Sequence, residues 1–199
     1  MNKLLKSSYT GNLMEAGVDE VGRGCLAGPV VAAAVILPKE YQQEQLNDSK
    51  KLTRKQREDL EPMIKQKALA WAIAEVSAEE IDQINIHHAS MLAMHRALEK
   101  LNLQPELLLI DGKHFSPFRF IPHVCIVRGD GKFQAIAAAS ILAKTYRDRL
   151  MEDLSAEYPA YDWANNAGYP TVKHRQAILE QGLSPWHRKT FKISPPSKS

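Results

Sequence analysis

The hydrophobic pattern begins with two apolar segments close together in the chain. Residues 16–20 and 30–37 are rich in Val and Ala, and the second is apolar enough to be buried on both faces of a sheet. A short glycine-containing link joins them, which predicts two neighbouring strands paired like a hairpin. A third strand is predicted over 69–76, whereas residues 1–13 are predicted to be a polar, loosely ordered lead-in.

Five other stretches carry helical signals. Two of them open with capping boxes, in which a Ser or Thr and a Glu or Gln three residues later bond each other's backbone. These are Thr53 with Gln56, and Ser77 with Glu80, whose helix Asn85 interrupts. The predicted helices span 53–67, 77–84, 86–101, 134–155 and 171–181.

Two further apolar strands each end at an acid flanked by glycine. Residues 107–110 lead into Asp111 and Gly112, and residues 123–128 lead into Gly129-Asp130-Gly131. Open α/β sheets bind ligands at the carboxyl ends of their strands. Two unrelated surface turns could give this pattern, but its repetition after two buried-looking strands favours a site.

The first strand also ends in acids. Asp19 and Glu20 are followed by the turn Gly22-Arg23-Gly24. Alternation places adjacent residues on opposite faces of a strand, yet a bulge or a strand end would let both carboxylates reach one site. Glycines also let the backbone approach a ligand closely. A solvated Asp-Glu pair at an edge turn is the alternative.

Four acids therefore share a position at strand ends: Asp19, Glu20, Asp111 and Asp130. Clusters made of carboxylates alone select hard cations such as Mg²⁺ or Mn²⁺. Two such ions about 3.5–4 Å apart can activate a water and stabilise the leaving oxygen of a phosphodiester. For each acid taken alone, a turn-forming role is the alternative. The sequence contains no Walker loop, dinucleotide fingerprint, serine nucleophile elbow or H-E-x-x-H zinc motif.

Length and cysteine usage narrow the class of protein. The 199 residues fit a single domain, expected over 14–193 with a disordered tail at 194–199. Cys25 and Cys125 have no C-x-x-C spacing, which argues against a disulfide framework or a zinc ribbon. The sequence has no apolar run of membrane-spanning length and no signal-peptide pattern. These features predict a cytoplasmic protein without a membrane segment.

The net charge of +3 conceals an asymmetry along the chain. Residues 171–199 contain six basic residues and one acid, whereas 20 basic and 22 acidic residues precede them. A basic C-terminal region on a nearly neutral body suggests a polyanionic partner. A solvated basic tail is the simpler alternative.

Together these motifs resemble those of ribonuclease HII, the bacterial type 2 ribonuclease H. The resemblance covers about residues 14–193. It implies a ribonuclease H-like α/β fold, in which helices flank a mixed sheet, with a small helical C-terminal region. It also implies a monomer that cleaves RNA in RNA–DNA hybrids and at single ribonucleotides in duplex DNA, with Mg²⁺ or Mn²⁺, as in ribonucleotide excision repair. The motifs that carry it are Gly17–Gly24, Gly28-Pro29, Asn47–Leu52, Ile110–Gly112, Gly129-Asp130, Ala137–Lys144, Arg147-Asp148 and Gly168–Thr171 with His174.

The resemblance assigns roles to individual residues. It makes Asp19, Glu20, Asp111 and Asp130 the metal-binding catalytic set, with Asp19 shared between two ions. It makes Gly22, Arg23, Gly24 and Tyr169 the readers of the ribose 2′-OH. Further candidates for substrate contact are Ser49, Lys50, Lys51, Lys144, Arg147 and Arg188, with solvation at the surface as the alternative for the basic ones.

Two positions depart from the family's pattern. Ala167 stands where the family usually has Lys, and Lys113-His114 stands where it usually has Asn-Arg. Two rival functions remain open: a catalytically silent nucleic-acid-binding module, and a two-metal hydrolase of a small phosphate ester. Neither rival needs both the four strand-end acids and the basic, aromatic C-terminal region.

Overall fold

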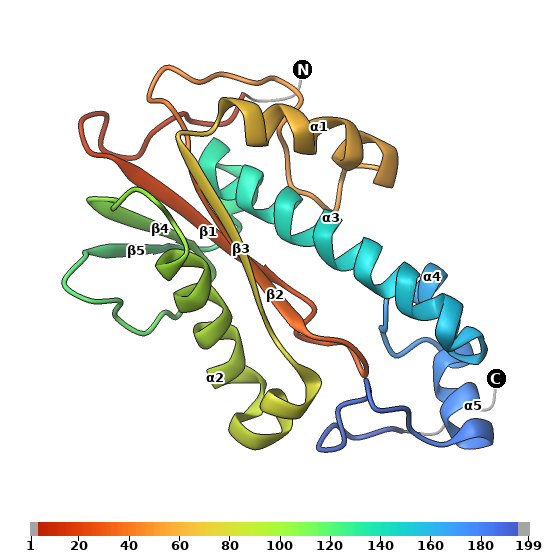
Figure 1. Cartoon of the computed structure of the whole chain (residues 1–199). Helices are drawn as coiled ribbons and strands as arrows, with labels where there is room; N and C mark the ends of the chain where they lie inside the picture. The colour runs from red at the N-terminus through yellow and green to blue at the C-terminus, as the bar shows by residue number, and fades with distance from the viewer. Residues whose placement is uncertain (1–3, 195–199) are drawn as a thin grey trace.

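A computed structural model describes residues 4–194 and contains a five-stranded mixed sheet (Figure 1). The strand order is β3-β2-β1-β4-β5; β1 pairs antiparallel with β2 and parallel with β4. This confirms the mixed sheet and the predicted pairing of the first two strands. The strands are β1 (Glu15–Val21), β2 (Val30–Ile36), β3 (Ala70–Val76), β4 (Leu107–Asp111) and β5 (His123–Ile126).

The helices begin where the capping residues predict. Both capping boxes form, at Thr53 and at Ser77, and Asn85 kinks the second helix with φ 64° and ψ 164°. Three short elements, η1 (Gly129–Gly131), η2 (Pro159–Tyr161) and α4 (Trp163–Asn166), lie beyond the sheet. The longer helices are α1 (Arg54–Lys67), α2 (Ala78–Glu99), α3 (Gln134–Glu157) and α5 (Val172–Gln181).

The helices form layers on both faces of the sheet (Figure 1). Helix α2 packs on one face against β2 and β3, and α3 packs on the other against β1 and β2, with α1 beside it. The approach of α3 is close because Gly17 has no side chain: a Cβ there would stand 2.1 Å from the Ala135 carbonyl carbon. The contact places the second half of α3 beside the carboxyl end of β1.

Residues 159–170 are part of a packed C-terminal unit. Trp163 is 0% exposed, and its ring stacks on Tyr161 with centroids 5.1 Å apart. The unit continues into α5, which ends at Gly182 as predicted, and it lies at the far end of α3 (Figure 1). The aromatic side chains in this unit thus build a second small core.

The N-terminal segment is better packed than predicted. Leu5 is buried, and the hydroxyls of Ser8 and Thr10 donate hydrogen bonds to the Glu15 carboxylate at 2.9 and 2.7 Å. The expected loose lead-in is therefore wrong for this part of the chain. Of the predicted tail, residues 195–199 lie outside the described residues.

Candidate active site

The four predicted acids lie close together, at the carboxyl ends of β1 and β4 and in the turn after β5. This group of Asp19, Glu20, Asp111 and Asp130 is called the acid edge. Val18 pairs with Ile110 in the parallel register of β1 and β4. The next residues along the two strands, Asp19 and Asp111, therefore lie side by side. The Gly129 N–H donates to Asp111 Oδ1 at 2.7 Å, which joins the end of β4 to the turn that carries Asp130. Strand pairing and this one turn bring together acids more than 100 residues apart in sequence.

Crowding of negative charge perturbs these carboxyl groups. Burial raises the pKa of Asp19 well above its usual range, and repulsion from Glu20 and Asp111 adds to the effect. Burial likewise raises the pKa of Glu20, against an opposing effect of Arg23, and burial with the Asp111 charge raises the pKa of Asp130 to about 6. Carboxylates held together in this way favour the binding of cations.

The donor set fits divalent metal ions. Within residues 4–194, no group of three or more His, Cys, Asp or Glu side chains lies close enough together to hold a metal ion by itself. Mg²⁺ does not require such a group, because it usually keeps several waters and binds one or two carboxylates together with substrate phosphates. An open, oxygen-only edge whose carboxyl pKa values are raised therefore suits Mg²⁺ or Mn²⁺ better than zinc.

Asp19 is held by its own strand end and by α3. The Glu20 N–H donates to Asp19 Oδ1 at 2.7 Å, and a hydrogen bond from Ser140 on α3 counters part of the rise in the Asp19 pKa. The Ser140 hydroxyl is in turn 2.8 Å from the Ser49 hydroxyl. Ser49 is 4% exposed, so it supports Asp19 through Ser140 instead of facing a substrate as predicted.

The loop that contains Ser49 brings further charge to the site. Asp48 raises the pKa of Asp130 and Lys50 lowers it, which shows that both lie near that carboxylate. Asp48 lies in the Asn47–Leu52 motif, but its position in the sequence does not indicate that it approaches Asp130. Lys50 and Lys51 are exposed and remain available to a polyanion.

The predicted ribose-reading residues lie beside the acids. Gly22 follows β1 with φ +93°, a conformation that L side chains rarely adopt, and the exposed Arg23 forms an ion pair with Glu20 at 3.1 Å. Leu26 N–H donates to the Gly168 carbonyl at 2.8 Å, which ties this loop to the one that carries Tyr169. The Tyr169 side chain is partly exposed. The structure thus brings together two segments about 145 positions apart.

Three predicted phosphate contacts need correction. Arg147 and Arg188 are 0% and 1% exposed, so neither guanidinium can reach a phosphate. Lys144 is only partly exposed and pairs with Asp148 at 2.5 Å. A one-dimensional pattern cannot distinguish a basic residue on the surface from one drawn inward by backbone carbonyls.

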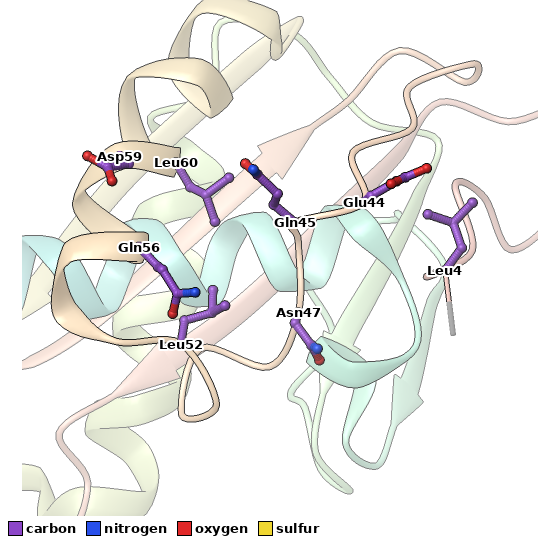
Figure 2. Close-up of a pocket in the computed structure, with 8 residues that line it drawn as sticks. All are labelled: Leu4, Glu44, Gln45, Asn47, Leu52, Gln56, Asp59 and Leu60. Atoms are coloured by element: carbon purple, nitrogen blue, oxygen red, sulfur yellow. The ribbon is translucent and has the colours of Figure 1, made fainter. Parts of the chain in front are cut away.

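A sizeable cavity lies away from these residues. It measures about 830 Å³, between α1 and the loop that precedes it, near Leu4 (Figure 2). Glu44 and Asp59 contribute its only charged side chains, and both are acidic, so it does not suit a nucleic acid. None of the four strand-end acids lines it.

The sheet topology and the acid edge define a nuclease with a ribonuclease H-like fold. Two solved structures share it. The ribonuclease H2 of Pyrococcus horikoshii has a TM-score of 0.77 and 25% identity, covering 90% of this chain and 94% of that one. The ribonuclease HII of Archaeoglobus fulgidus, solved in complex with PCNA, has a TM-score of 0.74 and 26% identity, covering 92% and 96%.

The chain belongs to the ribonuclease HII family, whose model matches residues 16–194. It is 59% identical to the ribonuclease HII of Parabacteroides distasonis over 96% of both chains. It is 60% identical to that of Bacteroides thetaiotaomicron, over 92% of this chain and 91% of the relative. Enzymes of this family are metal-dependent endoribonucleases that cleave RNA in RNA–DNA hybrids.

Proposed function

We propose that this enzyme also cleaves duplex DNA at a single embedded ribonucleotide, on its 5′ side, leaving a 3′-hydroxyl and a 5′-phosphate. Asp19, Glu20, Asp111 and Asp130 would hold one or two Mg²⁺ or Mn²⁺ ions. When bound, such ions lower the pKa of a coordinated water and neutralise charge on the leaving oxygen. The remaining tasks fall to the chain: to hold the phosphodiester in line and to recognise one ribose.

Recognition of the ribose is assigned to the Gly22-Arg23-Gly24 turn and Tyr169. The 2′-OH both donates and accepts hydrogen bonds, so backbone N–H groups can detect it directly. Among the described residues, the Arg23 and Gly24 N–H groups donate to no protein acceptor, and both residues are exposed. Tyr169 offers a ring that can stack on the neighbouring sugar.

Binding of the duplex would draw on exposed basic residues near the site. Lys50 and Lys51 lie on the loop beside Asp130 and are the best placed for phosphate contact. Each neutralised phosphate releases counterions, so affinity for a hybrid should fall steeply with salt. A flat salt dependence would instead favour a small phosphate ester as substrate.

One observation carries the proposal: three carboxyl groups whose pKa values burial raises lie beside a turn with two N–H groups that find no acceptor among residues 4–194. The test is cleavage of end-labelled duplex DNA carrying one ribonucleotide, compared with an all-DNA duplex and an RNA–DNA hybrid in Mg²⁺ and in Mn²⁺. We expect a single cut 5′ of the ribonucleotide and none in the all-DNA duplex. Cleavage of the hybrid alone would reject single-ribonucleotide recognition, and binding without any cleavage would favour a silent module.

Assembly and cell compartment stay predictions from the sequence. None of the helices in residues 4–194 is long and apolar enough to cross a membrane. The archaeal relative solved with PCNA shows that a protein of this fold can bind another chain. For this chain we retain the prediction of a monomer in the cytoplasm, which light scattering on the purified protein would test for assembly.

A further inference from the structure

Two buried arginines stand behind the ribose-reading turn without a carboxylate partner. Arg147 comes from α3 and Arg188 from the segment after α5, and neither forms an ion pair with any residue between 4 and 194. An unpaired buried charge is costly unless hydrogen bonds compensate it. Here the compensation comes from main-chain carbonyls, all but one of them in the loop of residues 22–29.

Arg188 binds both ends of that loop. Its guanidinium donates to the carbonyls of Gly22 at 2.7 Å and Arg23 at 2.9 Å. It also donates to the carbonyl of Gly28, at 2.9 and 3.1 Å. Burial lowers the pKa of Arg188 to about 10, which leaves it protonated at neutral pH. One planar cation thus gathers three carbonyls that would otherwise repel one another.

The direction of these carbonyls fixes the direction of the N–H groups. In a trans peptide the C=O and the following N–H point opposite ways. Because the Gly22 and Arg23 carbonyls turn inward to Arg188, the N–H groups of Arg23 and Gly24 turn away from it. These are the two N–H groups that donate to nothing else among the described residues.

Arg147 joins this loop to the Tyr169 segment. It donates to the carbonyls of Pro29 and Ala27, both at 2.9 Å, and to that of Ala167 at 2.7 Å. Gly22 is fitted against this side chain, since a Cβ there would stand 2.3 Å from Arg147 Nε. The two sides of the predicted ribose site therefore share one guanidinium.

The segment that carries Arg188 is itself fastened to the loop. Arg188 N–H donates to the Leu26 carbonyl and Gly28 N–H donates to the Trp186 carbonyl, both at 2.9 Å. Ala27 and His187 form an isolated antiparallel bridge between these hydrogen bonds. Main-chain hydrogen bonds therefore hold the backbone of Arg188 against the loop that its guanidinium binds.

From this geometry we propose that Arg188, with Arg147, is a positioning residue for ribose recognition. Its hydrogen bonds to the carbonyls of Gly22 and Arg23 hold the N–H groups of Arg23 and Gly24 toward the substrate. The inference rests on the proposed function, because it concerns the same turn. It goes beyond that function in assigning the turn's orientation to a side chain that never touches nucleic acid.

The test compares Arg188→Gln and Arg188→Lys with the control Arg96→Gln. Arg96 on α2 pairs with Glu80 at 2.7 Å, so Arg96→Gln shows the effect of losing an arginine contact that does not involve the loop. We expect Arg188→Gln to lower kcat/KM on the single-ribonucleotide duplex about 10- to 100-fold more than on a hybrid. Arg188→Lys should fall between it and the wild type, because one ammonium cannot span three carbonyls.

Hydrogen exchange separates positioning from general destabilisation. In Arg188→Gln the Leu26 and Gly28 amides should lose protection while amides in β1 and β2 keep theirs. An unchanged ratio of the two kcat/KM values, with unchanged exchange, would overturn the inference. The inference would also be overturned if kcat/KM fell equally on both substrates and in proportion to the fraction of unfolded protein.

A measurement that leaves Arg147 and Arg188 unchanged decides the matter even if the arginine variants fail to fold. The Arg23 and Gly24 amides should exchange rapidly in the free protein and slow when a single-ribonucleotide duplex binds in Asp111→Asn, where the duplex stays intact. Slow exchange in the free protein would contradict the outward orientation. Failure of the wild type to cut the single-ribonucleotide duplex would instead reject the proposed function and leave the orientation to be judged by exchange.

Discussion

Two neighbouring regions of this enzyme carry opposite charge. Of their acids and buried arginines, only Glu20 at the acid edge has a salt-bridge partner among the described residues, Arg23. At the acid edge, Asp19, Glu20 and Asp130 have raised pKa values because they are buried and mutually repulsive. Behind the turn that follows Glu20, the guanidiniums of Arg147 and Arg188 are buried with carbonyls as their only hydrogen-bond partners among the described residues. The acids and arginines could have neutralised one another, yet the fold keeps them apart.

This separation indicates that the two regions have different roles. Under the proposed function, a cation would complete the acid edge, whereas main-chain hydrogen bonds to Arg147 and Arg188 already hold the arginine-backed loop, residues 22–29. Such a site would need metal for chemistry but not for the shape of its proposed ribose-reading turn. The predictions below test whether the two regions act separately.

The largest effect is expected from Asp111→Asn. The neutral side chain keeps its shape but lacks the charge that balances a divalent cation, so turnover should fall at least about 1,000-fold. Duplex binding should be largely retained, because the loop is untouched. Single-turnover cleavage and a gel-shift titration check the two expectations, with the exposed Asp59→Asn as control. Near wild-type cleavage by both Asp111→Asn and Asp130→Asn in Mg²⁺ would show that the metal assignment is wrong.

Tyr169→Ala should give the next largest effect. We expect cleavage at a lone ribonucleotide to fall roughly 10- to 1,000-fold, or ~1.4–4 kcal/mol of transition-state stabilisation. Cleavage within a long hybrid should fall less. Tyr169→Phe, which keeps the ring, separates stacking from hydrogen bonding. Equal losses on both substrates together with a lower Tm would assign Tyr169 to packing.

A pair of glycine substitutions tests the fit between the turn and Arg147. Gly22→Ala adds a Cβ 2.3 Å from Arg147 Nε at a residue with φ +93°, whereas a Cβ at Gly24 would meet nothing within 4 Å. Gly22→Ala should destabilise the protein by about 1–3 kcal/mol. Gly24→Ala should leave the unfolding free energy nearly unchanged. Denaturant titrations of both variants give the comparison, and equal midpoints would contradict the close contact.

The smallest expected effect is a pH dependence of the unfolding free energy, caused by two buried histidines in the core behind Tyr169. Trp163 Nε1–H donates to His174 Nε2 at 3.0 Å, and that nitrogen is 3.1 Å from His187 Nε2, so the pair is suited to neutral imidazoles. Burial, with the nearby His174, lowers the pKa of His187 to about 4, and burial lowers that of His174. In the unfolded chain both should return to about 6.5.

The unfolded state therefore binds more protons than the folded state between about pH 6.5 and 4. Stability should be full above pH 6.5 and decline as the pH falls, by at most about 1.4 kcal/mol per pH unit for each histidine. Urea titrations from pH 7 to 4 measure the slope, and His187→Gln should reduce it. The same slope in His187→Gln would mean that other groups cause it.

The proximity of the four acids could be predicted from the sequence because the signals for it are local. Each acid stands beside a glycine or at a strand exit, and the strands follow from runs of apolar residues. The arginines were misassigned because their partners are distant: Arg188 binds Gly22 from 166 positions away. No periodicity marks a basic residue as buried when the acceptors are carbonyls of a loop. Ser140 and Asp48 were overlooked as site residues for a similar reason, since only the packed fold places them beside Asp19 and Asp130.

The most direct test of this division of labour is Mn²⁺ binding measured by calorimetry beside duplex binding measured by fluorescence anisotropy. The wild type, Asp111→Asn and Arg188→Gln would be compared on a duplex with one ribonucleotide. We predict that Asp111→Asn weakens Mn²⁺ binding at least about tenfold and keeps its preference for that duplex over all-DNA. Arg188→Gln should bind Mn²⁺ as the wild type does but lose the preference for the duplex with one ribonucleotide. If either variant loses both properties together, the acid edge and the arginine-backed loop are one coupled unit and the account is wrong.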